Sequence, residues 1–385
     1  MAIVEALRKD DMMAEEQRRG YLTRRSFVEL GSAAGFAALT GLSACAPGGT
    51  PSGQSGADTA PGTAPSGADS ASPANPAPAP TSDPAPAPQP GAADGASAPS
   101  QVYFVRAVNA DALKTVFDAL GPGISGTKIG VKLSSGEPGG HHFLQPSLIS
   151  GLVSAVNGTI VECNTAYGGR RGTAESHYKV AKDHGFTDIA SFQVMDEDGS
   201  YPLPVTGGLR LTENLVGAHF PEYDGFLVLS HFKGHAMAGF GGALKNISIG
   251  MASREGKCLI HTGGKSHTSW TGGVQSEFQE AMADASKAVL DAVGGNMLFV
   301  NVMNNLSVDC DCDSSPAAPK MADIGVLASA DPVALDQACV DLIYASDDNS
   351  ADLIRRMESR DGEYVLDAAE RVGVGSRTYE LIELA

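Results

Sequence analysis

The segment 230–246 is the richest in side chains that could do chemistry. It begins SHFKGH and continues into GFGGALKN, so histidines, lysines and glycines follow one another closely. Imidazoles bind metals and move protons, ammonium groups bind anions, and glycines leave backbone amides open to a ligand. The apolar run 226–229 precedes the segment, which is typical of a strand whose carboxyl end opens onto a site. Its titratable members are His231, Lys233, His235 and Lys245.

The glycine run from Gly239 to Gly242 predicts an anion-binding loop. It does not match the dinucleotide fingerprint, because Leu244 replaces the last glycine, and no Gly-Lys-Ser/Thr follows as in a P-loop. The amides of such a run can still form a nest for an anion beside Lys245, whereas close helix packing is the competing use of these glycines. The residues predicted to bind such a ligand are Arg170, Arg171, Lys233, Gly239, Gly241, Gly242, Lys245 and Asn246.

Cys310 and Cys312 alternate with three aspartates in the sequence DCDCD. Their sulfurs could hold one soft cation, could form a disulfide, or could belong to a plain acidic loop, and these alternatives stay open. The glycine and the distal glutamate of a calcium loop are missing. The predicted metal site, for a transition metal or an iron-sulfur cluster, consists of Cys310, Cys312, His231 and His235. The competing interpretation of the two histidines is a pair ordered by backbone hydrogen bonds.

Two of the remaining cysteines are predicted to be core thiols. No Cys-x-x-Cys occurs, so the closely spaced thiolates of a ferredoxin are absent from the sequence. Cys339 lies on the apolar side of an expected helix, and Cys258 lies in an expected strand within GKCLI. Both are therefore expected to pack in the interior.

Apolar runs alternate with helix-period patterns between residues 101 and 385. This alternation predicts a three-layer α/β fold, with a mostly parallel sheet and helices on both faces. Residues 193–206, with Asp198-Gly199 as the turn, are expected to form a hairpin excursion. The expected strands are 102–108, 128–133, 159–163, 226–229, 297–302 and 324–328. The expected helices are 111–120, 146–156, 173–184, 275–293 and one that follows Asp331-Pro332.

The unusual residues follow the expected strands. The loops that leave the carboxyl ends of parallel strands meet at one edge of a sheet. Four such segments carry histidine, cysteine, arginine or glycine together, and they are 134–142, 162–171, 230–246 and 309–313. The sequence therefore predicts a site at this edge, against the alternative that these are ordinary solvated turns.

The N-terminal hundred residues predict export and a tether. Arg24-Arg25 precedes the apolar stretch 30–44, which is typical of a twin-arginine signal peptide. Leu-Ser-Ala-Cys resembles a bacterial lipobox, so we expect removal of residues 1–44 and lipidation of Cys45. The segment 45–100 is rich in Ala, Pro, Gly and Ser, and from residue 46 on it has no aromatic residue, Leu, Ile, Val or Met. It predicts a disordered tether with a span of at least about 40 Å, followed by a single globular domain, 101–385.

The charge of the chain restricts its partners. The net charge is -18, and residues 1–44 contribute six basic and six acidic groups, so the mature protein keeps all of it. An acidic surface of this kind argues against nucleic acid as a partner. The expected location is outside the bacterial cytoplasm, with the protein anchored to the cell membrane through the lipid on Cys45.

The words SHFKGH, GFGGALKN and CDCD together resemble the domain of unknown function 362 family, known as uncharacterised iron-sulfur centre proteins. The resemblance covers essentially all of residues 101–385. It implies a family fold and a metal or redox association, and no substrate. Many members carry a ferredoxin segment after the position that matches 256–261, whereas this chain has residues 262–273 and then an expected helix.

Three functions remain open, and the sequence does not decide whether the protein is an enzyme. The first is a tethered lipoprotein with a metal or iron-sulfur redox site at the carboxyl edge of the sheet, serving an unknown small molecule or redox partner. The alternative is a lipoprotein that binds a small anionic ligand without metal. A hydrolase is third, because Ser134, Ser230 and the histidines offer parts but no GxSxG or triad spacing is present.

Overall fold

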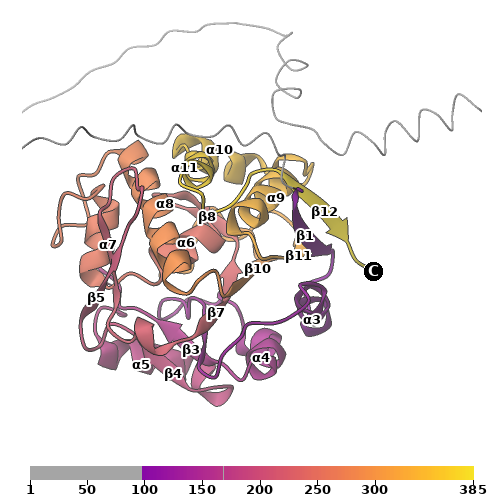
Figure 1. The fold of residues 1–385 in the computed structure, drawn as a ribbon. Helices are drawn as coiled ribbons and strands as arrows, with labels where there is room; N and C mark the ends of the chain where they lie inside the picture. Colours follow the sequence, from indigo (N-terminus) through magenta and orange to yellow (C-terminus); the bar gives the residue numbers. More distant parts are fainter. Residues whose placement is uncertain (1–97, 168) are drawn as a thin grey trace, which may run out of the picture. The chain divides into compact units, whose positions relative to one another are not determined.

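The computed structural model describes residues 98–167 and 169–385. The expected signal peptide, Cys45 and nearly all of the tether lie outside the described residues, so their assignments stay predictions. The main sheet of the described part has the strands β1 (Ser100–Val105), β2 (Ile129–Lys132), β3 (Thr159–Glu162), β4 (Phe192–Val194), β7 (Gly225–His231), β10 (Met297–Met303), β11 (Gly325–Ser329) and β12 (Tyr379–Glu383). They lie side by side in the order β12-β1-β11-β10-β7-β2-β3-β4 (Figure 1).

The sheet is parallel except for one strand. β10, β7, β2, β3 and β4 pair in parallel, and β12 pairs in parallel with β1. Only β11 runs against its two neighbours in this sheet. The central strands β7 and β10 are buried along nearly their whole length, as expected of strands covered on both faces. The predicted α/β fold with a mostly parallel sheet is confirmed.

Helices cover both faces of the sheet, and Figure 1 shows the two groups on opposite sides. One group consists of α3 (Ala110–Ala119), α4 (Pro146–Ala155) and α5 (Ala174–Asp183). The other consists of α6 (Ala243–Ser248), α8 (Gln275–Ala292), α9 (Pro332–Tyr344) and α11 (Tyr364–Arg371). Two more helices are α7 (Arg254–His261) and α10 (Ala351–Ser359), and short 3₁₀ turns are η1 (Phe186–Asp188) and η2 (Phe220–Glu222). None of these described helices is long and apolar enough to cross a membrane.

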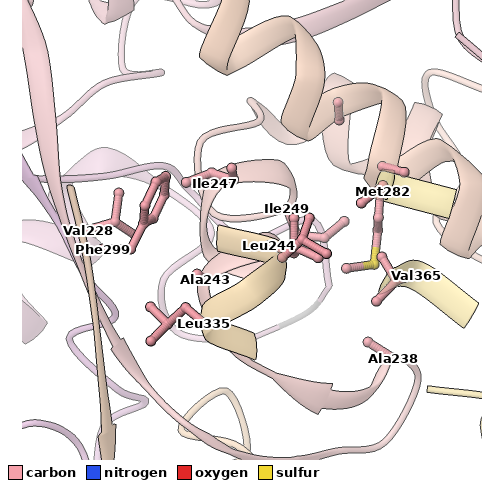
Figure 2. Packing of buried hydrophobic residues seen from close by; sticks show 14 of the residues in the cluster. Val228, Ala238, Ala243, Leu244, Ile247, Ile249, Met282, Phe299, Leu335 and Val365 are labelled. Atoms are coloured by element: carbon pink, nitrogen blue, oxygen red, sulfur yellow. The ribbon is translucent and has the colours of Figure 1, made fainter. Parts of the chain in front are cut away.

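Each face of the sheet has its own hydrophobic core. Successive residues of a strand point to opposite faces, so Leu227 packs in the core under α3 and α4, whereas Val228 packs in the core under α6 and α9. Figure 2 shows part of the second core, where Ile247 of α6 lies towards Val228 and Phe299 of the sheet. Lys132 and Ser230 share this second face, because they follow the same alternation. The polar ends of the strands therefore reach the space beside α6.

The hairpin excursion lies one segment later than expected. β5 (Ser200–Pro204) pairs with β6 (Glu213–Gly217), and not with residues before Asp198-Gly199. Residues 192–194 instead join the main sheet as β4, in parallel with β3, which buries Val194. An extended run does not specify its partner locally, and here burial on the sheet decides the pairing.

The expected strand around Cys258 is wrong, because this residue lies in the helix α7. Ser253 caps the helix, and its side chain accepts a hydrogen bond from the backbone N–H of Gly256. Serine directly before Arg254 and Glu255, an N-cap followed by two good helix formers, was the missed signal. Cys258 is buried in the interior, and so is Cys339 on α9.

The segment with His231 and His235 is a strand pair and not the loop that Gly234 suggests. β7 extends to His231, and β8 (Lys233–His235) pairs with β9 (Gly239–Gly241) in a small hairpin. A Cβ atom on Gly234 would lie 2.4 Å from the Val308 carbonyl oxygen. Glycine is needed here because the cysteine-bearing loop passes directly against the backbone of β8.

Candidate functional site

A cavity of about 480 Å³ lies where the four loops meet. It is bordered by residues that follow β2, β3, β7 and β10, as the parallel arrangement predicts. His141 and His142 of the first loop do not border it. The lining residues used below are Lys132, Arg171, Lys233, His235, Lys245, Lys257, His261, Trp270, Cys310 and Cys312.

His235, Cys310 and Cys312 come together at this cavity. A ring nitrogen of His235 and the two sulfurs lie within 4.8 Å of one another, so the three residues could hold a metal ion. In this structure the two cysteines form a disulfide, and a thiolate site would therefore require their reduction. The Nδ1 atom of His235 accepts hydrogen bonds from the backbone N–H groups of Met237 and Ala238, at 3.2 and 2.9 Å. Only Nε2 is left for the cavity.

Both ring nitrogens of His231 have hydrogen-bond partners within the protein. Its Nδ1 lies 2.9 Å from Asp311, and its Nε2 lies 2.6 Å from the carbonyl oxygen of Asn304. Lys233 also bonds to Asp311, at 2.7 Å. Burial alone would raise the pKa of Asp311, but these two partners outweigh it and lower the pKa to about 2. His231 and Lys233 therefore fix the cysteine loop through the aspartate between its two cysteines.

Three lysines that border the cavity form no ion pair with a carboxylate of the described residues. No carboxylate in residues 98–167 or 169–385 lies within ion-pair distance of Lys132, Lys245 or Lys257. Lys132 donates to the Leu133 carbonyl and the Asn246 side chain, and Lys257 donates to a backbone carbonyl. The Nζ of Lys245 makes no hydrogen bond to a described residue. Burial, followed by repulsion from Lys132, Arg171 and Lys257, lowers the pKa of Lys245 to about 8.

Lys132 is affected in the same way. Burial lowers its pKa to about 8, against the opposing attraction of Glu162. Lys132 is therefore a second ammonium group at the cavity whose charged form is disfavoured by burial. Positive charge that the fold leaves uncompensated around a cavity favours a negatively charged occupant.

The two predicted arginines have different positions. Arg170 is exposed and does not border the cavity. Arg171 is buried and bonds to Glu137 at 3.0 Å and to Glu162 at 3.1 Å. Its charge is balanced by these two carboxylates, so its main task is structural.

The glycine loop is held by a carboxylate of the protein itself. The backbone N–H groups of Ala243 and Leu244, the first amides of α6, donate to Asp336 at 2.8 and 2.9 Å. A Cβ atom on Gly242 would lie 2.3 Å from this carboxylate, which explains the glycine. Burial raises the pKa of Asp336 to about 6, although the N–H donors oppose the shift. These two amides are therefore not available to a ligand, whereas Gly241, Gly242, Lys245 and Asn246 do border the cavity.

An aromatic group forms another part of the wall. The Trp270 ring meets the rings of Tyr167 and His261 edge to face, with centroid distances of 6.5 and 6.4 Å. The Tyr167 hydroxyl donates to Glu137, and the His261 ring stacks on Phe278. Trp270 comes from the segment 262–273, which follows α7.

The described residues do not fit an iron-sulfur cluster held by four thiolates. Such a cluster takes four closely placed cysteines in most proteins. Although Cys163 also borders the cavity, the described residues bring only two sulfurs and one imidazole within 4.8 Å of one another there. The other described cysteines, Cys163, Cys258 and Cys339, are buried in the fold as free thiols.

Several residues of the site were not predicted from the sequence. Lys132 ends a buried strand, and a lysine in that position was a signal for a special environment. Lys257 and His261 lie four residues apart on α7. They were not recognised as neighbours because a strand was expected around Cys258. Asp336 follows the recognised cap Asp331 but its contact with α6 is visible only in the folded structure.

No protein with curated annotation matches the chain. One similar solved structure is the lactate racemase apoprotein from Thermoanaerobacterium thermosaccharolyticum, with 13% identity, a TM-score of 0.38, and coverage of 73% of this chain and 82% of that chain. Another is a protein from Thermotoga maritima, with 12% identity, a TM-score of 0.33, and coverage of 68% of this chain and 58% of that one. The family model described as a domain of unknown function, DUF362, matches residues 129–341, which include every cavity residue named above. The chain belongs to the DUF362 family.

Proposed function

We propose that this protein binds a small anionic molecule in the cavity. The observation that carries the proposal is the set of three lysines, Lys132, Lys245 and Lys257, whose charge no described carboxylate neutralises by an ion pair. Lys132 and Lys257 are buried and Lys245 is half-buried. Ammonium groups held partly or wholly out of water without an ion-pair partner cost free energy, and a bound carboxylate or phosphate would recover it. The volume of about 480 Å³ suits a ligand of metabolite size.

Calorimetric titration of the full-length protein at pH 7 tests this proposal. Inorganic phosphate and citrate serve as probes, with betaine as an overall neutral control of metabolite size. We expect at least one anion to bind in a single site, with an affinity that falls as sodium chloride is raised, because salt screens the ammonium groups. Absence of heat and of a thermal shift with both anions would refute the proposal.

A second function, metal or redox chemistry at the cavity edge, is supported by the proximity of His235, Cys310 and Cys312. We propose that the reduced pair of cysteines binds a soft transition metal there. Since Nδ1 of His235 already accepts two backbone N–H groups, coordination through Nε2 would require the ring to lose its remaining proton. The two sulfurs would therefore supply most of the affinity, and His231 would stay with Asp311.

In protein purified without oxygen and with its disulfide reduced, we expect about one equivalent of transition metal. Cys310→Ser and Cys312→Ser should lose it, because each removes a soft ligand. Cys339→Ser is the matched control, since this thiol is buried on α9 and lies outside the cavity; it should keep the metal and lose about 1 to 3 kcal/mol of stability. Elemental analysis measures the metal. A metal-free wild-type protein would leave anion binding as the only proposed function.

We also propose that the globular domain works outside the bacterial cytoplasm, held at the membrane by a lipid on Cys45 and the tether that follows it. The order of the twin arginines, the apolar stretch and the lipobox supports this proposal. Mass spectrometry of the membrane fraction would detect an N-terminal diacylglyceryl peptide starting at Cys45, and an intact N-terminus in the soluble fraction would contradict it.

A further inference from the structure

Two histidines border the cavity with their ring protons fixed in opposite positions. The Nδ1 atom of His235 accepts two backbone N–H groups, so it cannot carry a proton, and the ring proton lies on Nε2. His235 therefore offers a hydrogen-bond donor to the cavity. Its donor has no hydrogen-bond acceptor among the described residues.

The ring proton of His261 lies on the other nitrogen, Nδ1. Its Nδ1 lies 2.7 Å from the carbonyl oxygen of Lys257, and because a carbonyl can only accept, Nδ1 carries the proton. Burial, followed by repulsion from Lys245 and Lys257, lowers the pKa of His261 to about 4, so the ring is neutral at pH 7. Its Nε2 is then an acceptor, and no described residue donates to it. Stacking on Phe278 holds the ring in place.

We propose that this pair selects the ligand: His235 donates to an oxygen of the anion, and His261 accepts from a hydroxyl group of the same molecule. The inference rests on the proposed function. A ligand donor suits this position because the Nε2 lone pair of His261, a residue that borders the cavity, has no donor among the described residues. An ammonium group would also donate, but Lys132, Lys245 and Lys257 would repel it, so the donor is a hydroxyl. The ligand class is a hydroxylated phosphate or a hydroxylated carboxylate.

Two pairs of probes isolate the hydroxyl at nearly constant charge. Glycerol 3-phosphate is compared with propyl phosphate, and citrate with tricarballylate, by calorimetric titration of the full-length protein. In at least one pair we expect the hydroxylated member to bind about tenfold or more tightly, because its analogue leaves the His261 acceptor unpaired. The pair that shows the preference distinguishes phosphate from carboxylate recognition.

Two variants of His261 separate recognition from folding. In His261→Asn the amide can still donate to the Lys257 carbonyl but places no acceptor where Nε2 was, so the preference should fall to near one while the hydroxyl-free analogue binds as before. In His261→Gln the side-chain oxygen reaches the Nε2 position, so the preference should be largely restored. Thermal unfolding of both variants checks that they fold.

The outcomes distinguish this inference from the proposed function. Binding of anions without a hydroxyl preference in the wild type, or a preference that His261→Asn leaves intact, would overturn the assignment of His261 alone. Failure of all four probes to bind would overturn the anion site and the inference with it. A preference that is lost in the asparagine variant and kept in the glutamine variant supports both.

Discussion

Replacement of Arg171 by methionine is expected to lower the free energy of unfolding by about 3 to 5 kcal/mol. The arginine is buried between Glu137 and Glu162, which are themselves buried, and its removal leaves two carboxylates without their counter-charge. The Tyr167 hydroxyl and the His177 ring depend on the same carboxylates, at 2.8 and 3.5 Å. Urea denaturation of the wild type and the variant at pH 7 measures the loss.

Arg170→Met is the matched control, because the neighbouring arginine is exposed and its side chain has no ion pair among the described contacts. It should leave the unfolding midpoint nearly unchanged. Equal effects of the two substitutions would mean that Arg171 is not neutralised as the structure has it. If the Arg171→Met protein is stable but no longer binds anions, Arg171 is a ligand-binding residue, as the sequence predicted.

Lys245→Met should weaken binding of the anion by about 1.5 to 3 kcal/mol, or about 10- to 150-fold. The ammonium group borders the cavity without a hydrogen-bond partner in the described part of the chain, so its interaction energy is available to a ligand. The substitution keeps an unbranched side chain that is one atom shorter, and it removes the charge. Lys114→Met, which removes an exposed lysine paired with Asp118 on α3, is the control and should bind normally.

The affinity should also depend on pH, in a direction set by the lysines. The pKa values of Lys245 and Lys132 are lowered to about 8, and only their protonated forms attract the anion. Binding should therefore be strongest below pH 8 and should weaken as the pH rises through that value. Lys245→Met should show a shallower dependence, carried by Lys132 alone. An affinity that rises with pH would contradict the charge assignment.

The sequence was sufficient for β1, β2, β3, β7, β10 and β11 and for the edge at which the site lies, but not for the edge strands β4 and β12. Strands such as β7 and β10 are continuous apolar runs, and their boundaries follow from local pattern. The proximity of Cys310 and Cys312 to His235 could be predicted in the same way, since parallel strands bring the following loops together.

The ion-pair and hydrogen-bond partners of the charged and polar residues could not be predicted from the sequence. Arg171 and Lys245 look alike in the sequence, yet one has two buried carboxylates and the other has none. The partner Glu137 is 34 residues away from Arg171, and nothing local identifies it. The direction of the His261 ring likewise depends on the carbonyl of Lys257, which becomes available only because this segment is a helix and not the expected strand.

The position of Trp270 gives the protein a built-in optical reporter. The chain has a single tryptophan, and it borders the cavity beside Tyr167 and His261. When the unlabelled protein is excited at wavelengths that tyrosine does not absorb, its emission therefore comes almost entirely from one indole on the wall of the cavity. A change in the colour or intensity of that emission can be assigned to this wall without mutation or dye. The entry of a ligand can thus be timed in the native chain by rapid mixing.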